Sequence, residues 1–371
     1  MRNWKKLSVF GMVAALACGS VMTGCGSSQS TSTSTSAEPS ASASSEVAPS
    51  EASEMKIEIV AKGFQHDFWQ AVLKGTKQAE EEFGVKTNFV GPEGEGAIAA
   101  QVEQINNAIN KGPNAICLAA LDTSAALDAI SMAQSKNIPI VGFDSGVPGA
   151  PEGAVVANAA TDNYAAGGLA AEKLYEAIKD KVTDPAETVR IGVVSQEANS
   201  DSIVQRTAGF VDKMSSLIGE DKCLVEGHDK FSRKADGAKV IIEVRVPAEV
   251  TDNAGKTEAL TLLNKADLIA IYGSNEFAAK CIINANEGLN KLGNDKVIAV
   301  GFDSGALQLD AIKNNVFYGS VTQDPVSIGY TAVKLAVAAA KGEKVEDVDT
   351  GCLWYNSENM EDSNIAPCLY Q

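Results

Sequence analysis

The chain has 371 residues and a formal net charge of −17, because 48 Asp and Glu outnumber 31 Lys and Arg. So acidic a balance argues against nucleic acids and anionic lipid headgroups as partners. Residues 55–371 are long enough for two lobes of ordinary domain size, each with a hydrophobic core of its own.

The first 24 residues have the pattern of a secretory lipoprotein signal. Three basic residues precede an apolar stretch at 7–22, and small residues then lead to Cys25. This pattern predicts cleavage before Cys25, which would carry the lipid; Cys18 is a second candidate for cleavage. The alternative is an uncleaved membrane helix, but the apolar run is shorter than the roughly 20 residues that span a bilayer. Removing the signal takes away three basic and no acidic residues, so the charge becomes −20.

Residues 25–54 predict a disordered tether. Nearly all of them are Ser, Thr, Ala, Glu or Pro, without a hydrophobic period that could build a core. No later segment is apolar and long enough to cross a membrane. We therefore expect a protein held on the extracytoplasmic face of the cell membrane by a lipid anchor only.

Beyond the tether, predicted strands and helices alternate, which indicates βαβ winding about parallel sheets. The first run has strands at 56–62, 86–90, 115–119 and 138–143, and helices at 68–83, 97–111 and 124–136. The second run has helices at 164–179, 202–216, 253–265 and 276–292, and strands at 189–195, 222–228, 268–272 and 296–302. The second half therefore repeats the first.

The last part of the chain predicts passages between two lobes. It contains a short segment at 316–322, a helix at 326–341 and a tail with Trp354. Crossings near Thr161, Gln323 and Gly351 would form a three-strand hinge. We assign 55–161 with 324–351 to an N-terminal lobe, and 162–323 with 352–371 to a C-terminal lobe. The expected fold class is α/β, with two doubly wound parallel-sheet lobes.

One motif makes the internal repeat explicit. Gly-Phe-Asp-Ser-Gly occurs at 142–146 and again at 301–305, each time at the end of a predicted strand. Open parallel sheets bind ligands at the carboxyl ends of their strands, so Asp144 and Asp303 are expected at the two rims of a cleft. The alternative for both is a helix cap or a turn.

The cysteines and histidines give no sign of a metal site. The cysteines lack metal-like spacing, and His66 and His228 are far apart in the chain, so we expect neither a metal nor a cofactor. Cys352 and Cys368 are the pair considered for a disulfide, with unpaired thiols as the alternative. His66 lies in the cleft loop, where it is a candidate ligand contact.

A glycine-rich segment at 94–96 superficially fits a dinucleotide fingerprint. It follows the second strand rather than the first, and no acidic residue ends a strand about 20 residues later. We interpret it as a plain strand-to-helix loop.

Seven motifs in order resemble the ribose-binding type of periplasmic sugar-binding proteins, over about residues 55–350. The motifs are Phe68-Trp69 with Gly75, Asp144, Thr161-Asp162-Asn163 with Ala166-Gly167-Gly168, Arg206 with Gly209-Phe210, Ser274-Asn275-Glu276, Gly301-Phe302-Asp303, and Gln323-Asp324-Pro325. The resemblance implies a type I periplasmic binding protein fold, which is shared with the ligand domains of lactose-repressor regulators. It also implies a binding protein without enzymatic activity and an ABC importer permease as partner.

The resemblance further implies the site. Phe68 and Trp69 would sandwich a sugar ring, and five polar side chains would bind its hydroxyls: Asp144, Arg206, Asn275, Asp303 and Gln323. The chemistry agrees, because sugars offer apolar CH faces and hydroxyls that both donate and accept. From the residues alone, Phe68 and Trp69 have the core as their alternative place, and Arg206 has a surface ion pair.

Three positions depart from the family. The family usually has a small polar residue or Asn where Lys62 and His66 stand, and Asn where Ala119 stands. These departures argue against ribose itself. Lys62 or His66 in the cleft would favour a differently substituted sugar, or one with a negative group.

The sequence therefore predicts a monomeric solute-binding lipoprotein that captures a pentose or hexose between two lobes and delivers it to an ABC importer. Ligand contacts to both lobes would stabilise the closed state. One alternative is a sensory protein for a sugar-like signal of the autoinducer type. Another is a secreted glycosidase, which would need Asp144 and Asp303 as a carboxylate pair roughly 5 to 9.5 Å apart.

Overall fold

The computed structural model describes residues 54–371, all of them within one compact unit. The predicted signal, Cys25 and the tether up to residue 53 lie outside the described residues. Within the described part, no helix is both long and apolar enough to cross a membrane.

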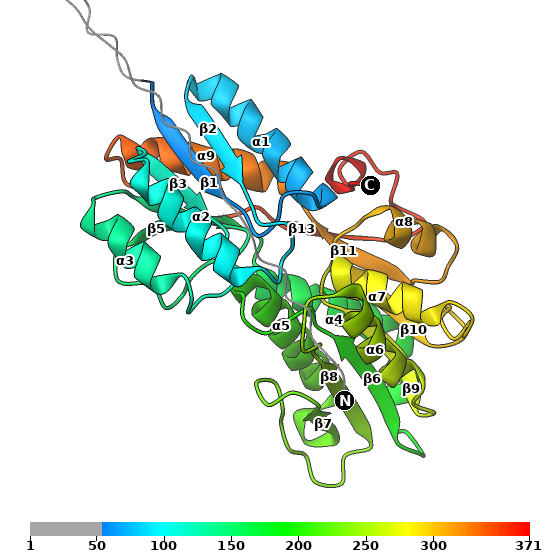
Figure 1. Ribbon diagram of the computed structural model, residues 1–371. Helices are drawn as coiled ribbons and strands as arrows, with labels where there is room; N and C mark the ends of the chain where they lie inside the picture. Colours follow the sequence, from blue (N-terminus) through cyan, green and yellow to red (C-terminus); the bar gives the residue numbers. More distant parts are fainter. Residues whose placement is uncertain (1–53) are drawn as a thin grey trace, which may run out of the picture. The chain divides into compact units, whose positions relative to one another are not determined.

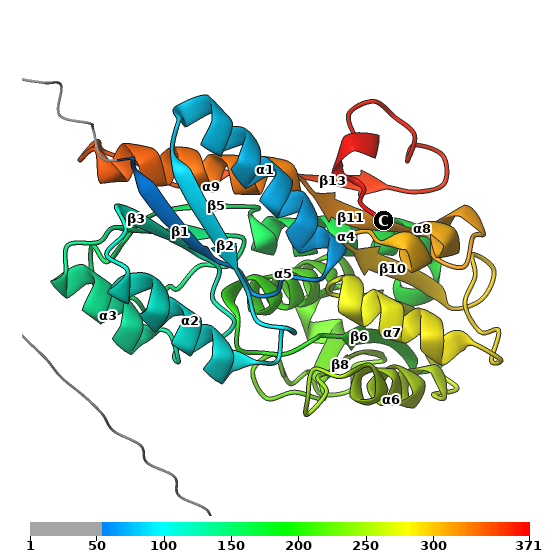
Figure 2. The same cartoon turned by 45° about the horizontal axis from the view of Figure 1, so that its top comes forward.

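The first lobe is built on a six-stranded sheet in which all neighbouring strands are parallel. Figures 1 and 2 show helices on both of its faces, α1 and α9 on one and α2 and α3 on the other. In spatial order the strands are β12 (Val348–Asp349), β5 (Val155–Ala160), β4 (Ile140–Phe143), β3 (Ala115–Leu118), β1 (Lys56–Val60) and β2 (Lys86–Val90). The helices are α1 (Asp67–Phe83), α2 (Ile98–Asn110), α3 (Leu127–Ser135) and α9 (Pro325–Ala340).

The second lobe is built on a seven-stranded sheet, parallel except for its edge strand β13. Helices α4 and α5 cover one face, and α6, α7 and α8 cover the other. In spatial order the strands are β13 (Cys352–Tyr355), β11 (Gly319–Gln323), β10 (Ile298–Phe302), β9 (Leu268–Gly273), β6 (Val189–Val194), β8 (Val240–Arg245) and β7 (Cys223–Glu226). The helices are α4 (Asn163–Val182), α5 (Asp201–Ile218), α6 (Asp252–Leu263), α7 (Glu276–Asn286) and α8 (Ala306–Lys313), with short 3₁₀ helices at Glu220–Lys222 and Ala366–Cys368.

The central strands are apolar on both faces because helices cover both sides of each sheet. In β3 and β4 every residue is buried, and so is every residue of β10. This double cover leaves the carboxyl ends of the strands as the place where polar side chains can gather.

The chain passes between the two sheets three times, from β5 to α4, from β11 to α9 and from β12 to β13. The first two passages end in the same way. Asp162 and Asp324 each cap the following helix by accepting a hydrogen bond from the backbone N–H three residues on. A local cap thus fixes where each helix begins after the crossing.

The predicted fold class is confirmed, with several differences in the elements. Strands β5 and β8 and helix α8 were not predicted, and residues 319–323 form strand β11 rather than a simple crossing. Helix α7 ends at Asn286 instead of 292, because the chain turns into left-handed backbone at Gly288 and Asn290, with φ of 77° and 51°.

The considered disulfide between Cys352 and Cys368 is not formed. All five cysteines of the described residues have free thiols. Cys352 lies in the edge strand β13, whereas the Cys368 thiol lies 3.9 Å from the carbonyl oxygen of Asn364. The two residues therefore serve separate local contacts.

Candidate ligand-binding site

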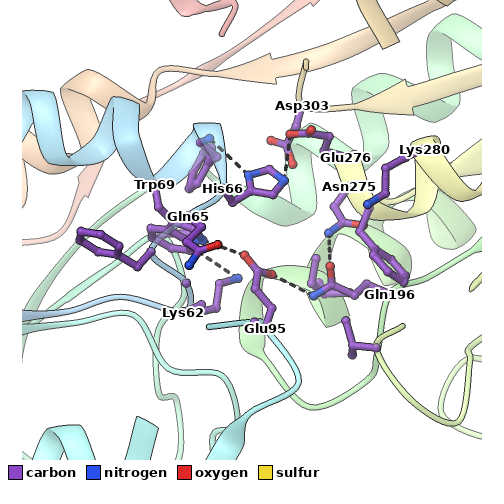
Figure 3. A pocket seen from close by; sticks show the side chains of 18 of the residues that line it. Lys62, Gln65, His66, Trp69, Glu95, Gln196, Asn275, Glu276, Lys280 and Asp303 are labelled. Atoms are coloured by element: carbon purple, nitrogen blue, oxygen red, sulfur yellow. Dashed lines mark hydrogen bonds and ion pairs between the residues drawn. The ribbon is translucent and has the colours of Figure 1, made fainter. Parts of the chain in front are cut away.

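A cavity of about 440 Å³ lies between the two lobes, within the range of roughly 300–1,000 Å³ that small-molecule sites occupy. The structure brings all nine residues of the predicted site to its walls. They are Lys62, His66, Phe68, Trp69, Asp144, Arg206, Asn275, Asp303 and Gln323. Figure 3 shows several of these side chains converging on the cavity from both lobes.

The two repeated aspartates form one charge cluster with Arg206. Asp144 and Asp303 follow β4 and β10 in left-handed backbone, with φ of 57° and 68°, a conformation that Asp tolerates better than most residues. Arg206 Nη1 lies 3.3 Å from Asp303 Oδ2, and Arg206 Nη2 lies 4.0 Å from Asp144 Oδ1. Neither aspartate caps a helix, so the alternative of a capping role does not hold.

Arg206 is a buried residue at the centre of this cluster, not a surface ion pair. Its Nε donates to Asn163 Oδ1 at 2.7 Å, and its guanidinium lies 4.1 Å from the ring centroid of Phe302. Arginine suits such a place because its planar guanidinium can stack on a ring while its edge binds carboxylates. The remaining donors of the guanidinium are available at the cavity wall.

Lys62 is neutralised within the site. Its Nζ lies 3.0 Å from Asp144 Oδ2 and donates to Ser202 Oγ of the other lobe at 3.1 Å. Burial lowers the pKa of Lys62, but Asp144 and Glu95 outweigh this effect and raise it above its usual value. Burial raises the pKa of Asp144, although Lys62 and Arg206 oppose the shift. The charge of Lys62 is therefore balanced within the site.

Phe68 and Trp69 form two adjoining walls rather than the expected sandwich. Their ring centroids are 4.9 Å apart and their planes meet at 89°, so no sugar ring fits between them. Both residues also belong to the core under α1, where Trp69 is 1% exposed. Neighbouring helical residues point in different directions, which is why the two rings cannot face each other in parallel.

Glu95, which sequence reasoning placed in a plain loop, is a central residue of the cavity. Its Oε1 accepts from Trp69 Nε1 at 2.8 Å, and its Oε2 accepts from Gln196 Nε2 of the second lobe at 2.9 Å. Burial raises the pKa of Glu95, but Lys62, His66 and these hydrogen bonds outweigh it and lower the pKa. Glu95 is therefore an ionised acceptor inside the site.

Amide side chains continue the polar wall on the second lobe. Asn275 caps α7 through its Oδ1 and donates from Nδ2 to Gln196 Oε1 at 2.6 Å. Gln323 Nε2 donates to Asp303 Oδ1 at 2.7 Å. Gln323 Oε1 is buried and has no hydrogen-bond partner within residues 54–371. An acceptor left open in this way can receive a hydrogen bond from a bound molecule or a water.

His66 and Glu276 form a pair across the cleft. His66 caps α1 by accepting from the backbone N–H of Phe68 at its Nδ1, and its Nε2 lies 3.2 Å from Glu276 Oε2. Burial raises the pKa of Glu276 to about 7, against the attraction of His66. The pair therefore links the first turn of α1 in one lobe to the first turn of α7 in the other.

Eight polar residues of the cavity wall were not predicted from the sequence: Gln65, Glu93, Glu95, Gln196, Asp252, Glu276, Lys280 and Tyr370. Gln196 follows strand β6, so the rule that placed Asp144 and Asp303 at strand ends could have found it. Glu276 was part of a motif but had no assigned role. No local pattern marks Glu95 or Tyr370, because each reaches the cavity from a loop or a terminal segment.

Two sheets with ligand-facing carboxyl ends and a polar cavity at the hinge define a two-lobed binding protein. Residues 57–344 match the family described as periplasmic binding protein domain, and the chain belongs to this family. Its members are binding proteins rather than enzymes, so the glycosidase alternative is not retained.

Relatives and solved structures agree with this assignment. The ribose import binding protein of Haemophilus influenzae is 26% identical over 300 residues, which cover 81% of this chain and 90% of that protein. A structure from Brachyspira murdochii, titled as an ABC transporter, LacI family transcriptional regulator, is 37% identical with a TM-score of 0.73, covering 86% of this chain and 99% of that one. An ABC transporter solute-binding protein from Agrobacterium vitis with bound D-fucose is 28% identical with a TM-score of 0.72, covering 85% and 100%.

Proposed function

We propose that this chain is the solute-binding protein of an ABC carbohydrate importer and that it captures a small neutral sugar in the cavity between its lobes. The observation that carries the proposal is the composition of the cavity wall. Aromatic faces of Phe68 and Trp69 adjoin carboxylates, amides and one guanidinium, which match the apolar face and hydroxyl rim of a sugar. The relatives named above include proteins titled for ribose and for D-fucose.

The charge balance of the site favours a neutral ligand over an acidic one. Lys62 and Arg206 are compensated by Asp144 and Asp303, and Glu95 adds a further negative charge. Lys280, a further lysine of the cavity wall, is paired with Asp252 at 2.8 Å. A carboxylate or phosphate on the sugar would therefore meet Glu95, while the lysines and the arginine of the wall already have carboxylate partners. We therefore place neutral pentoses and hexoses before sugar acids and sugar phosphates.

The site of action follows from the amino-terminal pattern. A lipid on Cys25 would hold the protein on the extracytoplasmic face of the membrane, and residues 26–54 would act as its tether. The lobes would then meet the importer permease while remaining free to reorient. Cleavage before Cys25 is checked by mass spectrometry of the membrane-associated protein, where an unmodified Met1 would contradict it.

A thermal-shift screen tests the proposal. The purified protein is heated with single pentoses, hexoses, sugar acids, inositols, nucleosides and amino acids. A sugar at 100 times its Kd should add about 2.7 kcal/mol of stability, which corresponds to a shift of about 5 °C. A response to neutral sugars supports the proposal, whereas a response to nucleosides or amino acids alone would overturn the ligand class.

Two matched variants, one in the cavity and one on the surface, test whether the sugar binds in the cavity. Asp303→Asn keeps the size of the side chain and removes an acceptor that faces the ligand, so affinity should fall at least 10-fold. Asp310→Asn changes an exposed residue of α8 and should leave affinity unchanged. Equal affinities for the two variants would remove Asp303 from the site.

A further inference from the structure

The segment after β13 returns to the cavity and ends against it. Residues 356–371 run beyond the family match, which stops at residue 344. Met360 and Ile365 of this segment are buried in the core of the second lobe. In Figures 1 and 2 the red end of the chain lies between α8 and the first turn of α1.

The backbone of Tyr370 is held beside Asp303. Its N–H donates to Ser304 Oγ at 3.0 Å, and its carbonyl oxygen accepts from Gly305 N–H at 3.1 Å and from Ser304 Oγ at 3.1 Å. The carbonyl of Cys368, two residues earlier, accepts from Thr322 Oγ1 at 3.1 Å. Both backbone groups of Tyr370 are thus fixed to the loop that carries Asp303.

The side chain of Tyr370 reaches across the cleft. Its ring meets the ring of Phe68 edge to face, with centroids 5.8 Å apart, and lies 6.5 Å from the ring of His66. Phe68 and His66 belong to the first lobe, whereas Tyr370 is anchored to the second. Tyr370 is therefore an aromatic contact between the lobes at the wall of the cavity.

The phenol group of Tyr370 lies beside the carboxyl group of Glu276. Its oxygen is buried and makes no hydrogen bond of full geometry within the described part of the chain, although its contact with Glu276 lowers the pKa of that carboxyl. Burial, together with Asp303 and Glu276, raises the pKa of Tyr370 well above its usual value, so the group remains protonated. A buried hydroxyl whose hydrogen bonding is incomplete is costly, and this one belongs to a residue that lines the cavity.

We propose that Tyr370 is a ligand-recognition residue whose phenol O–H donates a hydrogen bond to a hydroxyl of the bound sugar while its ring closes the cavity against Phe68. This inference rests on the proposed function. It assigns the terminal segment, which lies outside the matched family region, a direct part in selecting the sugar.

Affinity measurements on Tyr370→Phe test the inference, because this variant removes only the hydroxyl. The neutral sugar that gives the largest shift in the thermal-shift screen is carried forward, and its binding is measured by calorimetry. Tyr370→Phe should bind it roughly 2- to 10-fold more weakly than the unmodified protein. Tyr370→Ala, which also loses the ring, should lose more affinity than Tyr370→Phe.

Monodeoxy derivatives of the same sugar separate recognition from a structural role. One derivative, which lacks the hydroxyl that Tyr370 binds, should have equal affinity for the unmodified protein and for Tyr370→Phe. Tyr164→Phe is the matched control, because the Tyr164 hydroxyl donates to Asp212 outside the cavity. This control should bind all the sugars as the unmodified protein does.

The outcomes distinguish the two proposals. If the unmodified protein binds one of the sugars and Tyr370→Phe binds it equally well, the role of Tyr370 is wrong and the proposed function stands. If the unmodified protein binds none of the neutral sugars of the thermal-shift screen, the sugar proposal fails and the role of Tyr370 fails with it.

Discussion

Individual side chains in the cavity have two tasks, because they compensate one another's charge and leave groups open for a ligand. Lys62 and Arg206 are buried, and isolated buried ions are strongly unfavourable unless they are paired. Asp144 and Asp303 supply that pairing. The same carboxylates still have lone pairs toward the cavity, so stability and binding depend on the same residues.

Trp69 illustrates the consequence for mutagenesis. Because it packs in the core as well as lining the cavity, Trp69→Ala would remove core volume and cost about 3–5 kcal/mol of stability. A loss of binding in that variant would therefore not report on ligand contact. Tyr370→Phe preserves volume and charge and is the better probe. Asp303→Asn preserves volume but removes one partner of Arg206, so its free energy of unfolding is measured alongside its affinity.

At the residue scale we predict a pH-dependent stability from Glu276. Its pKa is raised to about 7 from an ordinary value of 4.5, so the folded state favours the protonated form. The protonated Glu276 side chain therefore contributes fully to the stability of the folded protein below about pH 4.5. This contribution is lost as the pH rises through about 7, where the buried carboxyl group has to ionise. Glu276→Gln cannot ionise, so at pH 8 it should exceed the unmodified protein in free energy of unfolding by up to about 3 kcal/mol.

Urea denaturation at pH 4.5 and pH 8 measures this difference. The two proteins should be much closer in stability at pH 4.5 than at pH 8. Glu287→Gln changes an exposed residue just after α7 and provides the control. The prediction would be contradicted if Glu276→Gln and the unmodified protein differed in free energy of unfolding by the same amount at pH 4.5 and pH 8.

At the scale of the helices and strands, two helices cross at close distance in each lobe, α1 with α9 and α4 with α5. Gly75 of α1 and Gly329 of α9 each face the backbone of the other helix, and Gly167 of α4 and Gly209 of α5 do the same in the second lobe. A Cβ at any of these positions would overlap a backbone carbonyl of the opposite helix. Glycine permits this close approach, which brings Arg206 of α5 to its place at the cavity.

For this crossing we predict opposite effects at two neighbouring glycines. Gly167→Ala would push α4 away from the Arg206 carbonyl and should cost about 1–3 kcal/mol of stability. Gly168→Ala would place its Cβ 3.7 Å from Lys213 Cβ, 3.8 Å from Lys213 Cγ and 4.0 Å from the Gly209 carbonyl oxygen, all ordinary contacts. It should therefore be neutral or stabilise the helix by up to about 1 kcal/mol. Thermal unfolding of both variants checks the prediction, and equal effects would exclude close packing as the cause.

In the whole molecule, hydrogen bonds join the two lobes directly across the cleft. Gln196 donates to Glu95, Lys62 donates to Ser202, and the backbone N–H of Ser202 donates to Ser145 Oγ at 3.2 Å. Three chain passages permit rotation of the lobes about a few residues. A ligand that contacts both lobes adds to these bonds only in the closed state, which is how binding favours closure.

For the whole molecule we predict that the hydrogen bond between Ser202 N–H and Ser145 Oγ, which lies outside the cavity wall, contributes to sugar affinity. Ser145→Ala removes the acceptor for Ser202 N–H, and neither residue lines the cavity. If the bond forms only on closure, its loss should lower sugar affinity roughly 2- to 10-fold and shift the sugar-loaded protein toward the open form. Calorimetry and small-angle X-ray scattering measure the two effects, and unchanged values of both would rule out this contribution.

The sequence by itself determined the fold class, the internal repeat and the meeting of Asp144 and Asp303 at one cleft, whereas the place of Arg206 beside them was implied only by the family resemblance. These features could be predicted because hydrophobic periodicity is local and because the carboxyl ends of parallel strands meet at one edge. The helices after the crossings, which are capped by Asp162 and Asp324, depend on equally local signals.

Only the tertiary structure decided how the side chains of the cavity are connected. Lys62 forms an ion pair with Asp144. Glu95 accepts hydrogen bonds from the Trp69 indole and from the Gln196 amide. Tyr370 contacts Phe68 across the cleft. These contacts join residues far apart in the chain, and their energies depend on burial that no local window contains. That is why Lys62, which in the sequence favoured a differently substituted or negatively charged sugar, is paired with Asp144 in the folded protein, as the proposal of a neutral ligand requires.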